Sequence, residues 1–200
     1  SEARRLYQLT REQCARTGDA YHAALCDLDE AELFLELNLT AEGAGMARSA
    51  AEQFAALRMP YEQGKALVSV AIAANQRGEP ALADKTLKVA RRLFVAEQNR
   101  VWPALVDQLR AVLAFHDKNY GRAQRLSASA TRVLSAATIP GRAAHGQIML
   151  ARLWLQAGYA DRARAYSREA LERLGDDTSP SVRFHAALLD GRSEERRVGK

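Results

Sequence analysis

Residues 150–171 read LARLWLQAGYADRARAYSREAL, and the spacing of small residues in this stretch recurs every 40 residues along the chain. Ala163 follows Ala151 by 12 positions, and Ala170 follows Ala163 by 7. Counting back in steps of 40 gives three columns of small residues, which are Ala31, Ala71, Ala111 and Ala151; Gly43, Ala83, Ala123 and Ala163; and Ala50, Ala90, Ala130 and Ala170. Self-similarity at a fixed period is typical of a stacked array of structural repeats.

Each repeat is predicted to be a pair of helices, because apolar residues recur at steps of three and four and no run alternates as strands do. A turn is expected within each pair at Asn38, Gly78, Lys118 and Gly158. Proline at positions 60, 140 and 180 is expected to begin the following helix. The small columns allow two helices to approach closely, and we expect the large apolar column to reach the next pair; it consists of Phe54, Phe94, Leu134 and Leu174.

The repeats divide the sequence into consecutive segments. Residues 1–20 are interpreted as the second helix of a truncated preceding repeat, and residues 181–191 as the start of a truncated fifth repeat. The four complete repeats span 21–60, 61–100, 101–140 and 141–180. Residues 192–200 (RSEERRVGK) break the pattern, and we interpret them as the translated read-through of a sequencing adapter rather than native sequence.

The spacing of 12 and 7 resembles that of the tetratricopeptide repeat (TPR). Repeat 4 matches that motif at Leu150, Ala151, Trp154, Gly158, Tyr159, Ala163, Ala170 and Leu171, whereas repeat 3 departs from it at Arg110 and Lys118. The resemblance implies an all-α fold, a right-handed α-solenoid of antiparallel helix pairs. Since an ordinary TPR has 34 residues, the six extra residues are expected after the last small column. HEAT and armadillo arrays also have periods near 40, but the spacing favours the TPR.

Two phrases, residues 24–39 and 99–113, also resemble the TPR regions that precede a CHAT domain, a caspase-like peptidase, in large bacterial proteins. This resemblance implies a recognition arm that does not itself catalyse a reaction, with any peptidase domain lying C-terminal to this segment. The alternative is the effector-sensing domain of a large ATP-dependent transcription activator. That alternative requires a phosphate-binding loop before this segment and a helix-turn-helix after it.

Composition and charge exclude several classes of partner. The longest apolar run, residues 66–74, is far shorter than a membrane span, and no secretory signal is visible. The net charge of +5 falls to +3 without residues 192–200, and repeat 1 is acidic. A nucleic-acid binder usually presents a coherent basic stripe with stacking aromatics, which is not seen, and the two cysteines lack the spacing of a disulfide framework. We expect a cytoplasmic protein that binds neither nucleic acid nor membrane.

No catalytic, cofactor or metal site is predicted. His22 and Cys26 are four residues apart on one helix, but two ligands do not make a zinc site. Cys26 and His116 lack an orienting third group, so a cysteine nucleophile is not expected. Motifs that bind phosphate or carry a nucleophilic serine are not found in the sequence.

The predicted function is binding of a protein or peptide in a concave groove lined by the first helix of each pair. Apolar anchors would hold an extended segment or a helix, Glu32 and Glu36 would select a basic residue, and Arg152 an acidic one. Lys65, Asn75 and Arg152 only partly match a carboxylate clamp. The alternative, that some of these side chains pack between repeats, stays open. The candidate groove residues are Glu32, Leu35, Glu36, Lys65, Asn75, Gln76, Gln108, Phe115, His116, His145, Arg152 and Gln156.

Overall fold

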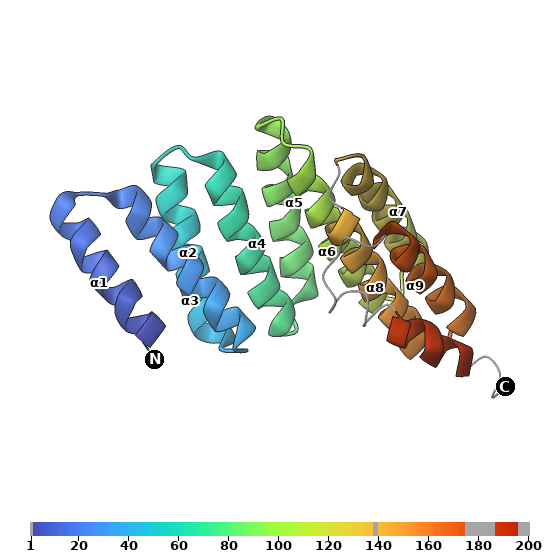
Figure 1. Cartoon of the computed structure of the whole chain (residues 1–200). Coiled ribbons are helices and arrows are strands. Elements are labelled where there is room, and N and C mark those ends of the chain that lie inside the picture. Colours follow the sequence, from blue (N-terminus) through green and yellow to red (C-terminus); the bar gives the residue numbers. More distant parts are fainter. Residues whose placement is uncertain (1, 138–139, 175–186, 196–200) are drawn as a thin grey trace. The chain divides into compact units, whose positions relative to one another are not determined.

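The computed structural model describes residues 2–137, 140–174 and 187–195, all in helices or in the turns between them (Figure 1). The chain divides into two compact units, residues 1–106 and 107–200. Unit 1 contains α1 (Glu2–Thr17), α2 (Ala20–Glu36), α3 (Thr40–Ala56), α4 (Pro60–Gln76), α5 (Pro80–Ala96) and the beginning of α6 (Val101–His116). Unit 2 contains the rest of α6, α7 (Tyr120–Ala136), α8 (Pro140–Gln156), α9 (Ala160–Leu174) and a helical stretch over residues 187–195.

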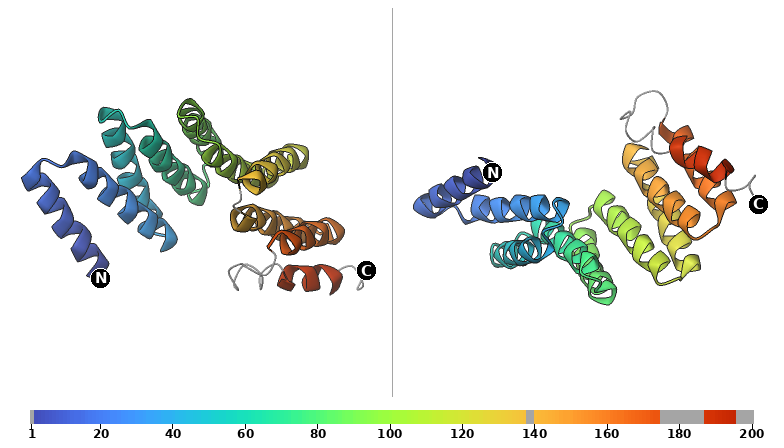
Figure 2. Two further views of the ribbon diagram at one scale, coloured as in Figure 1. Left: turned by 45° about the horizontal axis from the view of Figure 1, so that its top comes forward. Right: turned by 90° about the horizontal axis from the view of Figure 1, so that it is seen from below.

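Within each unit, consecutive helices run antiparallel and pack side by side (Figures 1 and 2). In unit 1, α2 packs against α3, α3 against α4 and α4 against α5, and α2 also touches α4. In unit 2, α8 packs against both α7 and α9. This arrangement confirms the predicted all-α fold of antiparallel helix pairs.

The helix-ending turns all use the same backbone geometry. One residue with positive φ occupies each described turn, at Gly18, Asn38, Arg58, Gly78, Gln98, Lys118 and Gly158. In the α2–α3 turn the Asn38 N–H donates to the Leu35 carbonyl at 3.1 Å and the Leu39 N–H to the Phe34 carbonyl at 2.8 Å. This is the Schellman pattern, in which a left-handed residue lets two N–H groups satisfy the last helical carbonyls.

The predicted turns at Asn38, Gly78, Lys118 and Gly158 are therefore confirmed. Arg58 and Gln98 show that the turns between pairs have the same geometry as those within pairs, so the backbone repeats every 20 residues. Proline begins α4 and α8 as predicted, at positions 60 and 140, while position 180 lies outside the described residues. After Ala50, α3 continues to Ala56, and the first helices α2 and α4 have the same length as α3, 17 residues.

The three small columns and the large apolar column are all buried. Gly43 shows why one column must be small: a Cβ placed there would lie 2.9 Å from the Leu35 side chain and 3.2 Å from the Ala31 carbonyl oxygen. Phe54, from α3, packs with Ala66 of α4, and therefore reaches the next helix pair as predicted. Phe94, from α5, likewise stacks on Trp102 of α6, with ring centroids 5.0 Å apart.

The helical stretch over residues 187–195 crosses position 192, where we place the end of the native sequence. Helix formation does not reveal the origin of a segment, so the read-through interpretation stays a prediction. The boundaries of the terminal repeats stay predictions as well, and residues 181–186 and 196–200 lie outside the described part of the chain. None of the described helices has the length and apolar character needed to cross a membrane.

Candidate functional site

The predicted binding residues of unit 1 lie on α2 and α4, two first helices that touch each other. Glu32, Glu36, Asn75 and Gln76 are exposed, and Lys65 is half-buried. The pKa of the Glu32 carboxyl is raised, mainly because the side chain is partly buried. The positive charge of Lys65 lowers this pKa, whereas the negative charges of Asp29 and Glu36 raise it. The structure therefore brings Asp29, Glu32 and Glu36 together as an exposed acidic face on α2, beside the amine of Lys65.

Gln76 has a structural contact as well as an exposed side chain. Its Nε2 donates to the Leu35 carbonyl oxygen at 3.2 Å and joins α4 to α2. Leu35 itself is 6% exposed and packs with Ala44 and Ala73. Leu35 is thus a core residue and not a ligand contact, because its position on α2 points toward α3 and α4.

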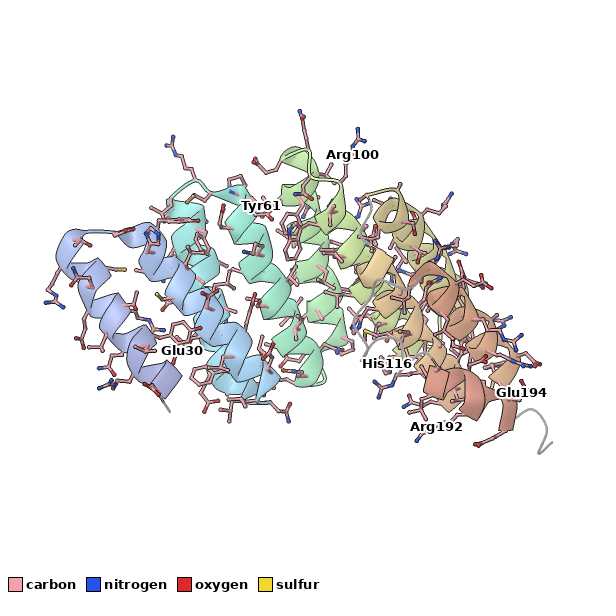
Figure 3. All side chains as sticks on the ribbon, in the orientation of Figure 1. Glu30, Tyr61, Arg100, His116, Arg192 and Glu194 are labelled. Atoms are coloured by element: carbon pink, nitrogen blue, oxygen red, sulfur yellow. The ribbon has the colours of Figure 1, made fainter. Side chains whose placement is uncertain are left out.

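The predicted binding residues of unit 2 also divide into exposed side chains and side chains buried in the core. His116, His145, Arg152 and Gln156 are exposed, and Gln108 is half-buried (Figure 3 labels His116). A Cβ at Gly146 would overlap the Gln108 amide, which shows that α6 and α8 meet there. Arg152 and Gln156 line an open hollow that also includes Arg192 and Glu195, from the segment interpreted as adapter read-through.

Phe115 is 7% exposed and belongs to an aromatic cluster in the core of unit 2. Its ring centroid lies 4.9 Å from that of Trp154 and 4.9 Å from that of Tyr120. Phe115 therefore packs in the core, as Leu35 does, which is the alternative left open for some of the candidate groove residues. Ten of the twelve predicted residues have side chains that are exposed or half-buried.

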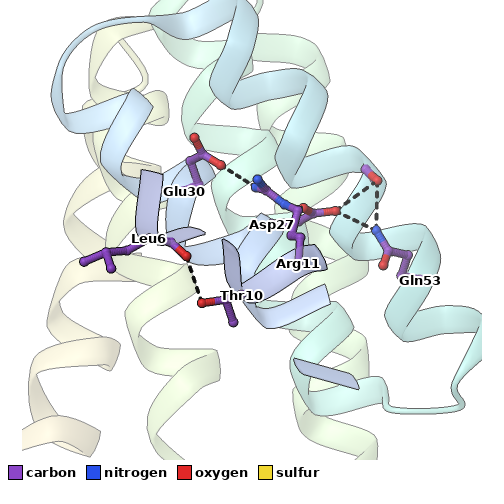
Figure 4. A network of polar contacts seen from close by, with 7 residues as sticks. Leu6, Thr10, Arg11, Asp27, Glu30 and Gln53 are labelled. Carbon is purple, nitrogen blue, oxygen red and sulfur yellow. Dashed lines mark hydrogen bonds and ion pairs between the residues drawn. The ribbon is translucent and has the colours of Figure 1, made fainter. Parts of the chain in front are cut away.

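A polar network joining α1, α2 and α3 is a feature that the sequence analysis missed (Figure 4). The Arg11 Nε donates to Asp27 Oδ1 at 2.7 Å, and its Nη2 pairs with the carboxylate of Glu30, which is only 4% exposed. Gln53 Nε2 donates to Asp27 Oδ2 at 2.8 Å. Asp27 and Glu30 are three residues apart, a spacing that places both on one helix face, but the sequence did not show that Arg11 reaches them.

The histidine and cysteines considered for metal binding or nucleophilic catalysis do not lie together in a site of that kind. His22 Nδ1 lies 2.7 Å from Asp19 Oδ2, and both side chains are well exposed. Cys14 and Cys26 are buried free thiols, and burial raises the pKa of the Cys26 thiol, with Cys14 adding to the effect. Among the described residues, no three His, Cys, Asp or Glu side chains gather in a way that could hold a metal ion.

No protein-family model matches the chain, and no curated protein matches it. A solved structure described as the crystal structure of BtubC (BKLC) from P. vanneervenii is similar, with a TM-score of 0.71. The two chains are 16% identical, and the match covers 98% of this chain and 88% of the other. At this identity the likeness shows the fold alone.

The fold is a TPR-like helical repeat array. This agrees with the TPR spacing in the sequence and favours it over the HEAT and armadillo alternatives. The array buries its small columns and exposes some polar residues of its first helices, such as Glu32, Glu36 and Asn75. These exposed side chains lie outside the columns of the repeat pattern.

Proposed function

We propose that this TPR-like array is a non-catalytic scaffold that binds a protein or peptide through its first helices. The observation that carries the proposal is the acidic face of Asp29, Glu32 and Glu36 on α2, exposed on a fold whose repeats present extended binding surfaces. Burial is the main cause of the raised pKa of Glu32, and repulsion from Asp29 and Glu36 adds to it; an arriving cation would relieve that repulsion. The preferred partner of this face is a segment rich in lysine or arginine.

The ligand contacts within unit 1 are proposed to be Glu32, Glu36, Lys65, Asn75 and Gln76. Asn75 and Gln76 lie at the C-terminal end of α4 and offer amide groups that can bond the backbone of an extended segment. Within unit 2, the half-buried Gln108 and the exposed residues His116, His145, Arg152 and Gln156 are proposed to act in the same way.

The experiment measures binding of a fluorescent Lys- and Arg-rich peptide to the purified chain by anisotropy, with an acidic peptide as comparison. The double variant Glu32→Lys/Glu36→Lys should weaken binding of the basic peptide by more than about tenfold, since two attractive charges become repulsive. The matched control is Glu52→Lys, an exposed acidic residue on the second helix α3, which should leave binding unchanged. Equal binding of the basic peptide by the double variant and the natural chain would show that this face is not part of the binding site.

We also propose that the array is the recognition arm of a larger bacterial protein of the cytoplasm that ends in a CHAT peptidase domain. The support is the sequence resemblance of residues 24–39 and 99–113. Sequencing the uninterrupted gene beyond residue 191 tests it. A downstream domain with a His and Cys pair is the expected result, whereas a downstream helix-turn-helix would favour the transcription-activator alternative.

A further inference from the structure

Unit 2 contains a hollow of about 460 Å³ between its two second helices, α7 and α9, with α8 forming its floor. Ser127 and Thr131 enter from α7, and Gln147 enters from α8. Arginine side chains surround the hollow at positions 132, 162 and 173. None of these residues belongs to the proposed peptide-binding surface, so the inference does not depend on that proposal.

The floor of the hollow carries buried polar atoms without hydrogen-bond partners. Ser127, Thr131 and Gln147 are 1%, 4% and 1% exposed, and Ser127 Oγ, Thr131 Oγ1 and Gln147 Oε1 have no partner in the described part of the chain. Buried hydroxyls elsewhere in the array bond to their own helix: Thr86 Oγ1 donates to the Leu82 carbonyl at 2.9 Å. Because buried polar groups in native proteins almost always have a partner, these three atoms point to a ligand or to ordered water.

The repeat architecture supplies an internal comparison, since unit 1 has a similar hollow of about 500 Å³ between α3 and α5 over α4. The residues 80 positions before Ser127, Thr131 and Gln147 are Ala47, Ala51 and Leu67. Likewise, Leu82 and Leu93 stand 80 positions before Arg162 and Arg173. The unit 1 hollow also has polar lining residues, such as Gln63 and Thr86, but the three positions that correspond to Ser127, Thr131 and Gln147 are apolar there.

Three arginines and one carboxylate, that of Glu169, line the unit 2 hollow, so cationic groups are in excess there. Arg162 lies over the Trp154 ring at 4.6 Å from its centroid, and neither Arg162 nor Arg132 forms a salt bridge with a described carboxylate. Arg173 pairs with Glu169 at 2.6 Å and donates to Ser135 at 2.8 Å, but its buried Nε has no partner among the described residues. The rim thus offers guanidinium N–H groups to an anion.

We propose that this hollow binds a small hydroxylated anion, such as a phosphorylated sugar. The arginines would hold the phosphate, and the hydroxyls of Ser127 and Thr131 can donate to or accept from the ligand. Gln147 Oε1 can only accept a hydrogen bond, so the ligand must also carry an O–H or N–H donor. A volume of about 460 Å³ falls in the range of known small-molecule sites.

The test uses isothermal titration of the full chain with glucose 6-phosphate, glycerol 3-phosphate, inorganic phosphate and glucose. The triple variant Ser127→Ala/Thr131→Ala/Gln147→Leu gives unit 2 the floor residues of unit 1. It should weaken glucose 6-phosphate binding by at least about a hundredfold, because three polar contacts are lost. Its melting temperature should stay the same or rise, since it removes buried polar atoms that lack partners. A readout of stability therefore distinguishes loss of the site from loss of the fold.

The arginine contribution is tested with Arg132→Gln, which should weaken binding of the phosphorylated sugar by about tenfold or more. The matched control is Arg48→Gln, which alters an arginine lining the unit 1 hollow and should leave binding unchanged. Equal binding of glucose 6-phosphate by the triple variant and the natural chain would overturn the proposal. Absence of binding for all four probes up to about 10 mM would also overturn it and assign the floor atoms to ordered water only.

Discussion

Replacing Gly78 by alanine should lower the free energy of unfolding by about 1 kcal/mol, although the new methyl group would touch nothing. Gly78 has φ of 77°, and a Cβ placed on it finds no atom within 4 Å. An L-residue in this left-handed region costs about 1–2 kcal/mol. Alanine also lowers the conformational entropy of the unfolded chain relative to glycine, which offsets about 0.4–1 kcal/mol of that cost. The expected loss in the free energy of unfolding is the backbone strain that is not offset.

The opposite substitution, from another residue to glycine, can be made at the equivalent turn position of the next repeat. Lys118 has φ of 58° in the equivalent turn, so Lys118→Gly should raise the free energy of unfolding by about 1 kcal/mol. Gly45→Ala is the matched control for Gly78→Ala: Gly45 is exposed within α3, and a Cβ there also meets no atom within 4 Å. It should raise the free energy of unfolding by about 0.5–1 kcal/mol, because alanine is preferred inside a helix.

Urea unfolding followed by circular dichroism measures all three variants, and a change of 1 kcal/mol corresponds to about 2–4 °C in melting temperature for a chain of this length. At these exposed positions, the backbone angle φ and not side-chain contacts decides whether a glycine substitution raises or lowers the free energy of unfolding. Stabilisation by both Gly78→Ala and Gly45→Ala, or destabilisation by Lys118→Gly, would refute it.

Three further variants test packing and charge. Arg11→Met should lower the free energy of unfolding by about 2 kcal/mol, because Glu30, only 4% exposed, loses a cationic partner; unchanged urea unfolding would contradict this. Phe94→Ala should lower it by about 3–5 kcal/mol and alter the fluorescence of Trp102, on which Phe94 stacks; an unaltered emission spectrum would show that the stack is not formed. The pKa of Glu32 is raised on folding, so its ionisation favours the unfolded state, and Glu32→Gln should be more stable than the natural chain at pH 7. This difference should vanish below the ordinary glutamate pKa of about 4.3, and unfolding curves that differ equally at pH 3.5 and pH 7 would contradict it.

Much of the fold could be predicted from the sequence because the helix pairs are defined by local signals. Ala31 and Gly43 show this: each is small where two helices must approach, and each is buried as expected. The turn at Asn38 was also predictable, since asparagine tolerates positive φ. Arg58 and Gln98 were not identified as turn residues of the same kind, because their side chains give no preference for that backbone conformation.

The candidate site was only partly predictable, because one step along a helix turns a side chain by about 100°. Glu36 is exposed whereas its neighbour Leu35 is buried against α3 and α4. Glu32 and Glu36 were identified from the sequence because charged residues rarely occupy a core. Phe115 was misplaced because an aromatic side chain suits a groove and a core equally well, and its packing against Trp154 depends on α8, which is distant in the sequence.

By itself, the sequence determined the repeat period, the helix pairing and the small residues that set the distance between helices, because these patterns recur along the chain at a fixed interval. Only the tertiary structure decided that Arg11 of α1 pairs with Glu30 of α2, and that Ser127 of α7 and Gln147 of α8 line the same hollow. These residues lie on different helices, and their separations in the sequence follow no fixed period. Their contacts depend on how each side chain packs among its neighbours, which the repeat pattern does not determine.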